Sequence, residues 1–192
     1  LKNEGYVTGH FGKWHLGSQG FYPEDNGFDI NIGGNDSGGP GGYFSPYINP
    51  NLEDGPIGEY LTDRIGNEVI SFINYNQNET FFAYVPFYSV HSPIQSKKEY
   101  QEKYSNKDGD KNHNRPDYAG MIESLDENIG KILNTIEELN LSEKTLIIFT
   151  SDNGGIRAIS NQFPLKAGKG SYYEGGIKVP LIFSWKGKIK EE

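Results

Sequence analysis

Residues 12–17 read Gly-Lys-Trp-His-Leu-Gly and place a lysine and a histidine two positions apart. If this run is extended, side chains alternate, so Lys13 and His15 share one face and Trp14 lies on the other. A fixed cation beside a titratable imidazole could hold an oxyanion and move a proton next to it. The same residues also fit a short buried strand with an exposed lysine. His10 falls on the face opposite Lys13, and we assign it no role.

Polar residues follow two apolar runs further along the chain. His91 follows the run at 80–90, and Asp152 and Asn153 follow the run at 144–150. Sites in open α/β sheets gather beyond the carboxyl ends of strands, so we expect these residues to face one crevice. Carboxylate and amide oxygens suit Ca²⁺ or Mg²⁺, although a Ca²⁺ shell of about 6–8 oxygens needs further ligands. Asp-Asn-Gly-Gly is also an ordinary turn sequence.

Lys169 lies between Gly168 and Gly170. Glycines on both sides let the backbone approach a ligand closely, and the ammonium group is a point charge for an anion. The alternative is a flexible basic loop whose charges lie in solvent.

Regular elements must position these residues. Apolar residues at helical spacing predict helices at 59–76 and 116–139, the second with Pro116 in its first turn and Asn114 as its cap. Nearly continuous apolar runs predict strands buried on both faces, at 80–90, 144–150 and 179–185. Strands alternating with long helices indicate a layered α/β fold with a largely parallel sheet.

The segment 17–58 is crowded with glycine, proline, asparagine and aspartate. A loop of this length inside a compact domain is usually functional or disordered. Its tyrosines and phenylalanines argue against disorder, because disordered segments are poor in aromatic residues. We therefore predict an ordered loop that lines a pocket.

Composition excludes several classes of protein. The 192 residues suit one domain, and the formal net charge of −8 without any basic block argues against a nucleic-acid partner. No apolar run approaches the roughly 20 residues that span a bilayer. The chain has no cysteine, so it forms no disulfide. The oligomeric state cannot be predicted from these features.

Four blocks in this order resemble the sulfatase family of the alkaline-phosphatase-like superfamily. They are residues 5–17, 91–93, 151–154 and 168–176. The resemblance implies a layered sandwich with a mixed, largely parallel central sheet and helices on both faces. It also implies a sulfuric ester hydrolase in which a formylglycine, made from Cys or Ser, attacks sulfur beside a divalent cation, usually Ca²⁺, with Mg²⁺ as the alternative.

The resemblance assigns a role to each matching residue. Asp152 and Asn153 correspond to metal ligands, while Lys13 and Lys169 correspond to cations that bind the sulfate group. His15 corresponds to the residue that stabilises the formylglycine hydroxyl and helps release sulfate. His91 corresponds to a substrate-binding acid that protonates the leaving alcohol, together with Lys169.

Two features of the family are absent from the sequence. The nucleophile motif, Cys or Ser followed by x-Pro-x-Arg, does not occur, and neither does the pair of aspartates that completes the metal site. Both lie upstream of the first block in the family, and a smaller subdomain follows the last. We therefore expect residues 1–192 to be a partial catalytic domain with half a metal site and no turnover of its own.

Two other functions stay open. One is a phosphodiesterase or phosphonate monoester hydrolase of the same superfamily, although residues 13–15 and 168–170 favour sulfate. The other is a non-catalytic carbohydrate-binding relative that uses the aromatic residues between Phe21 and Tyr47. For the sulfatase we expect a sulfated carbohydrate, or an aryl sulfate, as substrate, and a periplasmic or secreted location.

Overall fold

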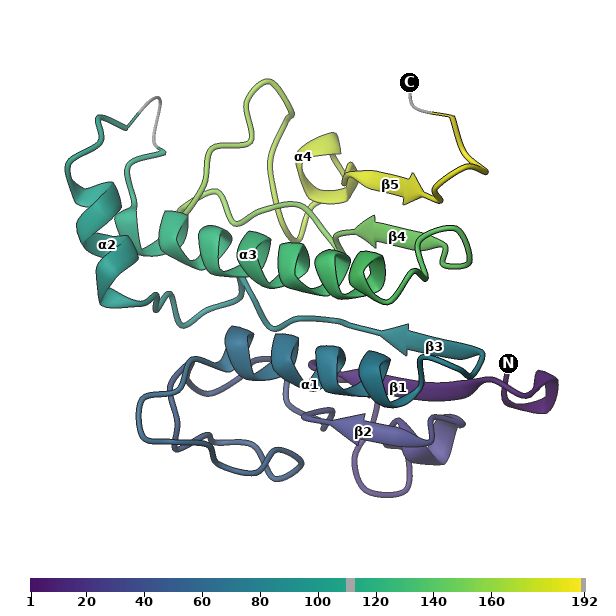
Figure 1. The fold of residues 1–192 in the computed structure, drawn as a ribbon. Coiled ribbons are helices and arrows are strands. Elements are labelled where there is room, and N and C mark those ends of the chain that lie inside the picture. Colours follow the sequence, from purple (N-terminus) through teal and green to yellow (C-terminus); the bar gives the residue numbers. More distant parts are fainter. Residues whose placement is uncertain (110–112, 191–192) are drawn as a thin grey trace.

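The computed structural model describes residues 1–109 and 113–190, which form two small sheets and a set of helices (Figure 1). The strands are β1 (Val7–Phe11), β2 (Ile30–Ile32), β3 (Phe81–Tyr84), β4 (Ile147–Thr150) and β5 (Leu181–Ser184). The α-helices are α1 (Leu61–Tyr75), α2 (Lys98–Ser105), α3 (Pro116–Glu138) and α4 (Glu174–Ile177). Short 3₁₀ turns occur at Lys2–Glu4 and Glu24–Asn26.

β1 is the central strand of a parallel sheet with the order β2-β1-β3. Gly9 lies opposite Ile30 on one side and Ala83 on the other. β4 and β5 form a separate antiparallel pair, in which Ile147 lies opposite Ser184. β3 and β4 point the same way in Figure 1, so the loops that follow them leave from the same end of the molecule. The layered α/β fold with a parallel sheet is confirmed.

Two predictions about the strands were wrong. β3 ends at Tyr84 and does not continue to 90, because Pro86 has no N–H and the chain turns there, with Phe87 N donating to Val85 O. The strands are also not buried on both faces. In β4 and β5 the side chains of Ile148 and Phe183 are 55% and 48% exposed. Within the described residues these two strands pair only with each other, so their faces are left open.

The first predicted helix forms as α1 and packs against β1 and α3. The residues of its apolar stripe are all buried, namely Leu61, Ile65, Val69, Phe72 and Ile73. Burial of a whole stripe at this spacing is what fixes an amphipathic helix on a sheet.

The second predicted helix forms as α3, with Pro116 in its first turn as expected. The predicted cap was wrong, because the N-cap residue is Arg115 and no side chain caps the helix. The face that packs on α1 is also more polar than predicted, with Ser124 and Asn128 fully buried. A Cβ atom at Gly66 of α1 would lie 2.3 Å from Asn128 Oδ1, so the two helices meet closely at this point.

The long segment 17–58 is ordered, as predicted. It contains β2, which the sequence did not predict, and its residues Asn35 and Tyr43 are almost completely buried. Phe44 forms a bridge with Tyr60, which ties the end of the segment to the start of α1. α2 was also missed, because it buries no residue completely and so has no apolar stripe.

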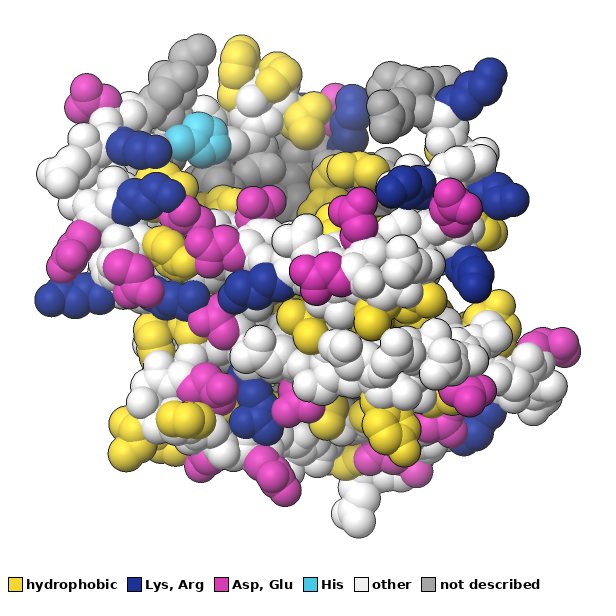
Figure 2. Space-filling view, in the orientation of Figure 1, with side chains coloured by type: hydrophobic (Ala, Val, Ile, Leu, Met, Phe, Trp, Pro, Cys, Tyr) yellow, Lys and Arg dark blue, Asp and Glu magenta, His cyan; other side chains and the backbone are white. Residues whose placement is uncertain are grey.

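On the face of the molecule that carries α2 and α3, acidic and basic side chains are interspersed (Figure 2). Several form ion pairs, including Lys98 with Glu102 and Lys186 with Glu137. No helix within residues 1–109 and 113–190 is long and apolar enough to cross a membrane.

Candidate active site

The chain turns sharply where β1 ends. Gly12 has a φ of +125°, and a Cβ atom there would lie 2.2 Å from the carbonyl oxygen of Pro86. Lys13 N donates to that same oxygen at 2.8 Å, and His15 has a left-handed φ of +56°. The segment is therefore not extended, and the prediction that Lys13 and His15 share a strand face was wrong. Trp14 does anchor the segment, since its indole N–H donates to Phe21 O at 2.8 Å.

His10, to which the sequence assigned no role, holds the backbone of Lys13. Its Nε2 lies 3.1 Å from Lys13 O, and because a carbonyl only accepts, Nε2 carries the proton. The ring is fully buried and packs edge-on against Trp14 at 5.3 Å between centroids. Burial lowers the pKa of His10 to about 4, so the ring is neutral at pH 7. Its Nδ1 has no hydrogen-bond partner among the described residues.

His15 and His91 both lie against a pair of glycines in the long segment 17–58. A Cβ atom at Gly38 would lie 2.9 Å from His15 Cε1, and one at Gly39 would lie 3.1 Å from His91 Nδ1. His15 N also donates to Asn35 O at 2.9 Å. The structure thus brings the first and second sequence blocks together, with the glycine pair as the point of contact for both imidazoles.

The ring of His91 is oriented by its own neighbour. Nδ1 lies 2.8 Å from the carbonyl oxygen of Ser92, so Nδ1 donates there. Nε2 makes no hydrogen bond with any described residue and is free to face a ligand. The histidine is half-buried. This is the arrangement that a proton donor requires, with one ring nitrogen fixed and the other available.

The remaining predicted residues lie together after β4. A Cβ atom at Gly154 would lie only 1.8 Å from Gly175 O, so the turn carrying Asp152 and Asn153 packs backbone to backbone on the start of α4. Lys169 N donates to Gly155 O at 2.9 Å, which attaches the lysine loop to the same turn. The third and fourth blocks therefore form one unit.

Two oxygen ligands in this unit fit a hard cation. Asp152 is exposed, and Asn153 Nδ2 donates to Gly154 O at 2.9 Å, which leaves Asn153 Oδ1 without a hydrogen-bond partner among the described residues. No group of three or more His, Cys, Asp or Glu side chains in the described part of the chain could hold a metal. Asp152 and Asn153 Oδ1 could provide two of the roughly 6–8 oxygens of a Ca²⁺ shell, and their role as metal ligands stays a prediction.

The sequence proposed six site residues but did not reveal the contacts that hold them in place. The glycine pair at 38–39 was taken only as a sign of a loop, and Tyr43, which binds the backbone of His91, was taken as one aromatic residue among several. Neither has a pattern that could have revealed it, because each acts through a contact with a residue far along the chain.

The chain resembles known proteins over its whole length. The sulfatase family profile matches residues 1–192. A sulfatase of Formosa agariphila is 40% identical over 152 residues, 73% of this chain and 27% of that protein. The N-acetylgalactosamine-6-sulfatase of Canis lupus familiaris is 33% identical over 98% of this chain and 39% of its own length. The chain thus spans between about a quarter and two-fifths of these relatives.

A solved structure gives the same result in three dimensions. Ps i-CgsB, in complex with k-i-k-neocarrahexaose, superposes with a TM-score of 0.83 at 33% identity, over 97% of this chain and 46% of that one. The sequence blocks and these matches agree, and the chain belongs to the sulfatase family, with its alkaline-phosphatase-like fold.

Proposed function

We propose that the whole protein is a sulfuric ester hydrolase that removes sulfate from a sulfated carbohydrate, and that residues 1–192 form part of its catalytic domain. The observation that carries the proposal is the meeting of His15 and His91 at Gly38–Gly39. A protein that only bound sugars would not need two imidazoles at one place, whereas a hydrolase needs a proton donor beside the scissile bond.

His91 acts as the acid. When the S–O bond breaks, negative charge develops on the bridging oxygen of the leaving alcohol. A proton delivered there lowers the barrier, typically by about 10²–10⁴-fold in rate. Protonated His91 keeps its Nδ1–H on Ser92 O and directs Nε2–H to the ligand. Lys169 assists the same proton transfer.

Lys13 and Lys169 bind the sulfuryl oxygens. Fixed positive charge stabilises oxygen atoms that gain negative charge in the transition state. The backbone of Lys13 is fixed by His10 and Pro86, so its side chain starts from a defined point. His15 would contact the hydroxyl of a formylglycine, which would supply the nucleophile. The Cys- or Ser-x-Pro-x-Arg motif from which that group would be made does not occur in this sequence.

Asp152 and Asn153 Oδ1 are two of the metal ligands, with Ca²⁺ as the preferred ion and Mg²⁺ as the alternative. A dication held there would offset the charge of the sulfate group and polarise its oxygens. The pair alone would not fill a Ca²⁺ shell, so further ligands would be required.

A sulfated sugar is the proposed substrate. Support comes from the named activity of the relative N-acetylgalactosamine-6-sulfatase and from the oligosaccharide in the Ps i-CgsB complex. Exposed aromatic rings suited to stacking on a sugar occur in both halves of the chain, at Phe21 and at Tyr172, which is 97% exposed. A periplasmic or secreted location accords with such a substrate.

The test uses the full-length protein, an aryl sulfate, and sulfated oligosaccharides from which free sulfate is measured. We expect sulfate release that is lost with a chelator. In His91→Ala we expect a loss of at least about 10²-fold on the sulfated oligosaccharides and a smaller loss on the activated aryl sulfate. The control is His113→Gln, which changes an exposed histidine outside both groups of site residues. Hydrolysis of aryl phosphates in place of sulfates would transfer the assignment to a phosphoesterase, and sugar binding without hydrolysis to a binding protein.

A further inference from the structure

His91 lies in a connection that has no regular secondary structure of its own. It is reached from β3 through a turn in which His91 N donates to Tyr88 O at 2.9 Å, and α2 begins only at Lys98. Neither a helix nor a strand therefore fixes the position of the proposed acid. Its position has to be set by contacts from other parts of the chain.

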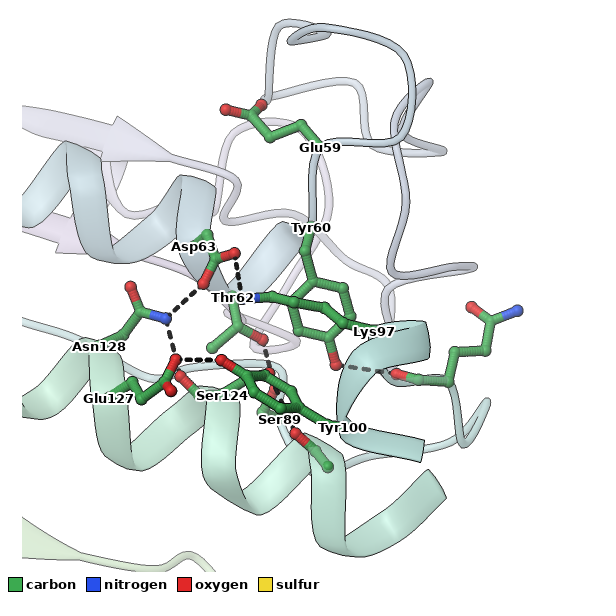
Figure 3. Close-up of polar contacts among 12 residues, drawn as sticks. Glu59, Tyr60, Thr62, Asp63, Ser89, Lys97, Tyr100, Ser124, Glu127 and Asn128 are labelled. Atoms are coloured by element: carbon green, nitrogen blue, oxygen red, sulfur yellow. Dashed lines mark hydrogen bonds and ion pairs between the residues drawn. The ribbon is translucent and has the colours of Figure 1, made fainter. Parts of the chain in front are cut away.

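Both ends of this connection are attached to the start of α1, as Figure 3 shows for the first of them. Thr62 Oγ1 and Ser89 Oγ lie 2.6 Å apart, just before the turn. Beyond it, the Tyr60 hydroxyl donates to Gln95 O at 2.8 Å. These contacts fix the connection before and after His91, but neither contacts His91 itself.

Tyr43 contacts His91 directly. Its hydroxyl lies 2.8 Å from both Tyr88 O and His91 O, the two carbonyls that bracket the turn. A phenol has a single proton and both partners only accept, so the proton is shared between them. The side chain is fully buried, and burial raises the pKa of Tyr43 far above its ordinary value, so the hydroxyl remains a donor.

The same loop also contacts the ring of His91. Gly39 lies against the imidazole, where a Cβ atom would be 3.1 Å from Nδ1 and 3.3 Å from Cε1. Tyr43 N donates to Gln95 Oε1 at 3.0 Å, which ties the loop to the connection once more. Within residues 39–43, Tyr43 therefore holds the backbone of His91, and Gly39 restricts the position of its imidazole ring.

We propose that the loop segment 39–43 positions His91 for proton transfer, with Tyr43 holding its carbonyl and Gly39 setting the place of its ring. Both act through His91 and are therefore positioning residues. The inference rests on the proposed role of His91 as the acid. If it is correct, replacing these residues lowers kcat/KM only for substrates whose leaving group must be protonated.

The first test compares Tyr43→Phe with Tyr88→Phe in the full-length enzyme. Each variant loses one buried hydroxyl, but that of Tyr88 donates to Gly33 O at 2.9 Å and not to the carbonyl of His91. kcat/KM is measured for a series of sulfate esters whose leaving alcohols range from acidic phenols to sugar hydroxyls. A misplaced acid slows only the poor leaving groups, because good ones depart without a proton.

We expect Tyr43→Phe to lose about 10–100-fold on sugar sulfates and less than about threefold on the most activated aryl sulfate. Tyr88→Phe should lower both to the same small extent. Equal losses across the series in Tyr43→Phe, or the same pattern in both variants, would overturn the inference. Placing Tyr43→Phe on a His91→Gln background should abolish its selective effect.

The second test does not remove a buried hydrogen bond and so remains informative if Tyr43→Phe does not fold. Gly39→Ala adds a methyl group against His91, whereas Gly42→Ala, in the same segment, places its Cβ 3.8 Å from the nearest atom, Gln95 Oε1. Gly39→Ala should show the same selectivity for poor leaving groups, and Gly42→Ala should not. If the wild-type enzyme releases no sulfate from any ester, the proposed function fails and this inference with it. If the wild type is active and neither variant is selective, only the positioning role fails.

Discussion

Asp63 in the first turn of α1 and Lys97 immediately before α2 form an ion pair of 2.6 Å, and Asn128 Nδ2 of α3 donates to the same carboxylate at 2.7 Å (Figure 3). Three helices thus meet at one carboxylate. The side chains of Asp63 and Lys97 are only 23% and 16% exposed, and Lys97 Nζ also lies 5.1 Å from the ring centroid of Tyr100.

Removal of the cation from this cluster should destabilise the fold. In Lys97→Met the carboxylate of Asp63 keeps its bond from Asn128 but stays partly buried without a counter-charge. We expect the free energy of unfolding to fall by about 1–3 kcal/mol, measured by urea denaturation. Lys98→Met is the matched control, because its pair with Glu102 is exposed and worth less than about 0.5 kcal/mol. Equal losses in the two variants would contradict this account.

The buried His10 should make stability depend on pH. Its pKa in the folded state is about 4, below the ordinary value of 6.5, so the unfolded chain binds the proton more readily. The contribution is fully present above about pH 6.5 and is lost as the pH falls toward 4, with a total of up to about 3 kcal/mol. His10→Gln should remove this part of the pH dependence, while His113→Gln, at an exposed site, should retain it. Unfolding curves at pH 7 and pH 4.5 would show whether the two variants differ.

Substitutions at Gly38 and Gly39 should distinguish the roles of His15 and His91. In Gly38→Ala the new methyl group lies 2.9 Å from His15 Cε1 and displaces that ring. Because His15 acts on the nucleophile and not on the leaving group, we expect kcat/KM to fall by about 10–100-fold for activated and poor leaving groups alike. The measurement is the same leaving-group series as for Gly39→Ala. A selective loss in Gly38→Ala would show that His15 does not have the role assigned to it.

The proposed role of Asp152 as a metal ligand predicts a specific effect on the affinity for Ca²⁺. Asp152→Asn replaces a charged ligand by a neutral one, so the full-length enzyme, stripped with chelator, should need at least about tenfold more Ca²⁺ to recover activity. Calcium titration followed by calorimetry gives the affinity without reference to turnover. Asp126→Asn, on the exposed surface of α3, should bind Ca²⁺ as the wild type does. Unchanged affinity in Asp152→Asn would exclude that carboxylate from the metal site.

The sequence predicted best those features that depend on periodic patterns. α1 follows directly from an apolar stripe, because burial of such a stripe is enough to fix a helix. β2 and α2 were missed because β2 has only three residues and α2 buries none completely. Neither therefore shows an apolar pattern that can be recognised in the sequence. The helix–helix contact at Gly66 and Asn128 is polar and so lies outside any apolar pattern.

The members of the candidate site could be proposed from sequence motifs, whereas their geometry could not be predicted. Lys13 and His15 were found by motif, but the sharp turn at Gly12 depends on the carbonyl of Pro86, which no local pattern reveals. In the same way, the contact of His10 with Lys13 depends on the turn itself. Motifs identify the groups that take part in chemistry, whereas long-range backbone contacts decide how those groups face one another.

The close contact between Gly154 and Gly175 has a consequence for ligand binding at the turn with Asp152 and at Lys169. The turn with Asp152 and Asn153 cannot shift without moving the loop of Lys169, because Lys169 N donates a hydrogen bond to Gly155 O at the end of that turn. A cation held by the turn would therefore also restrict the lysine loop, and an anion held by Lys169 would in return restrict the turn. Dication and sulfate ester should then bind with positive cooperativity, each raising the affinity for the other by the same factor.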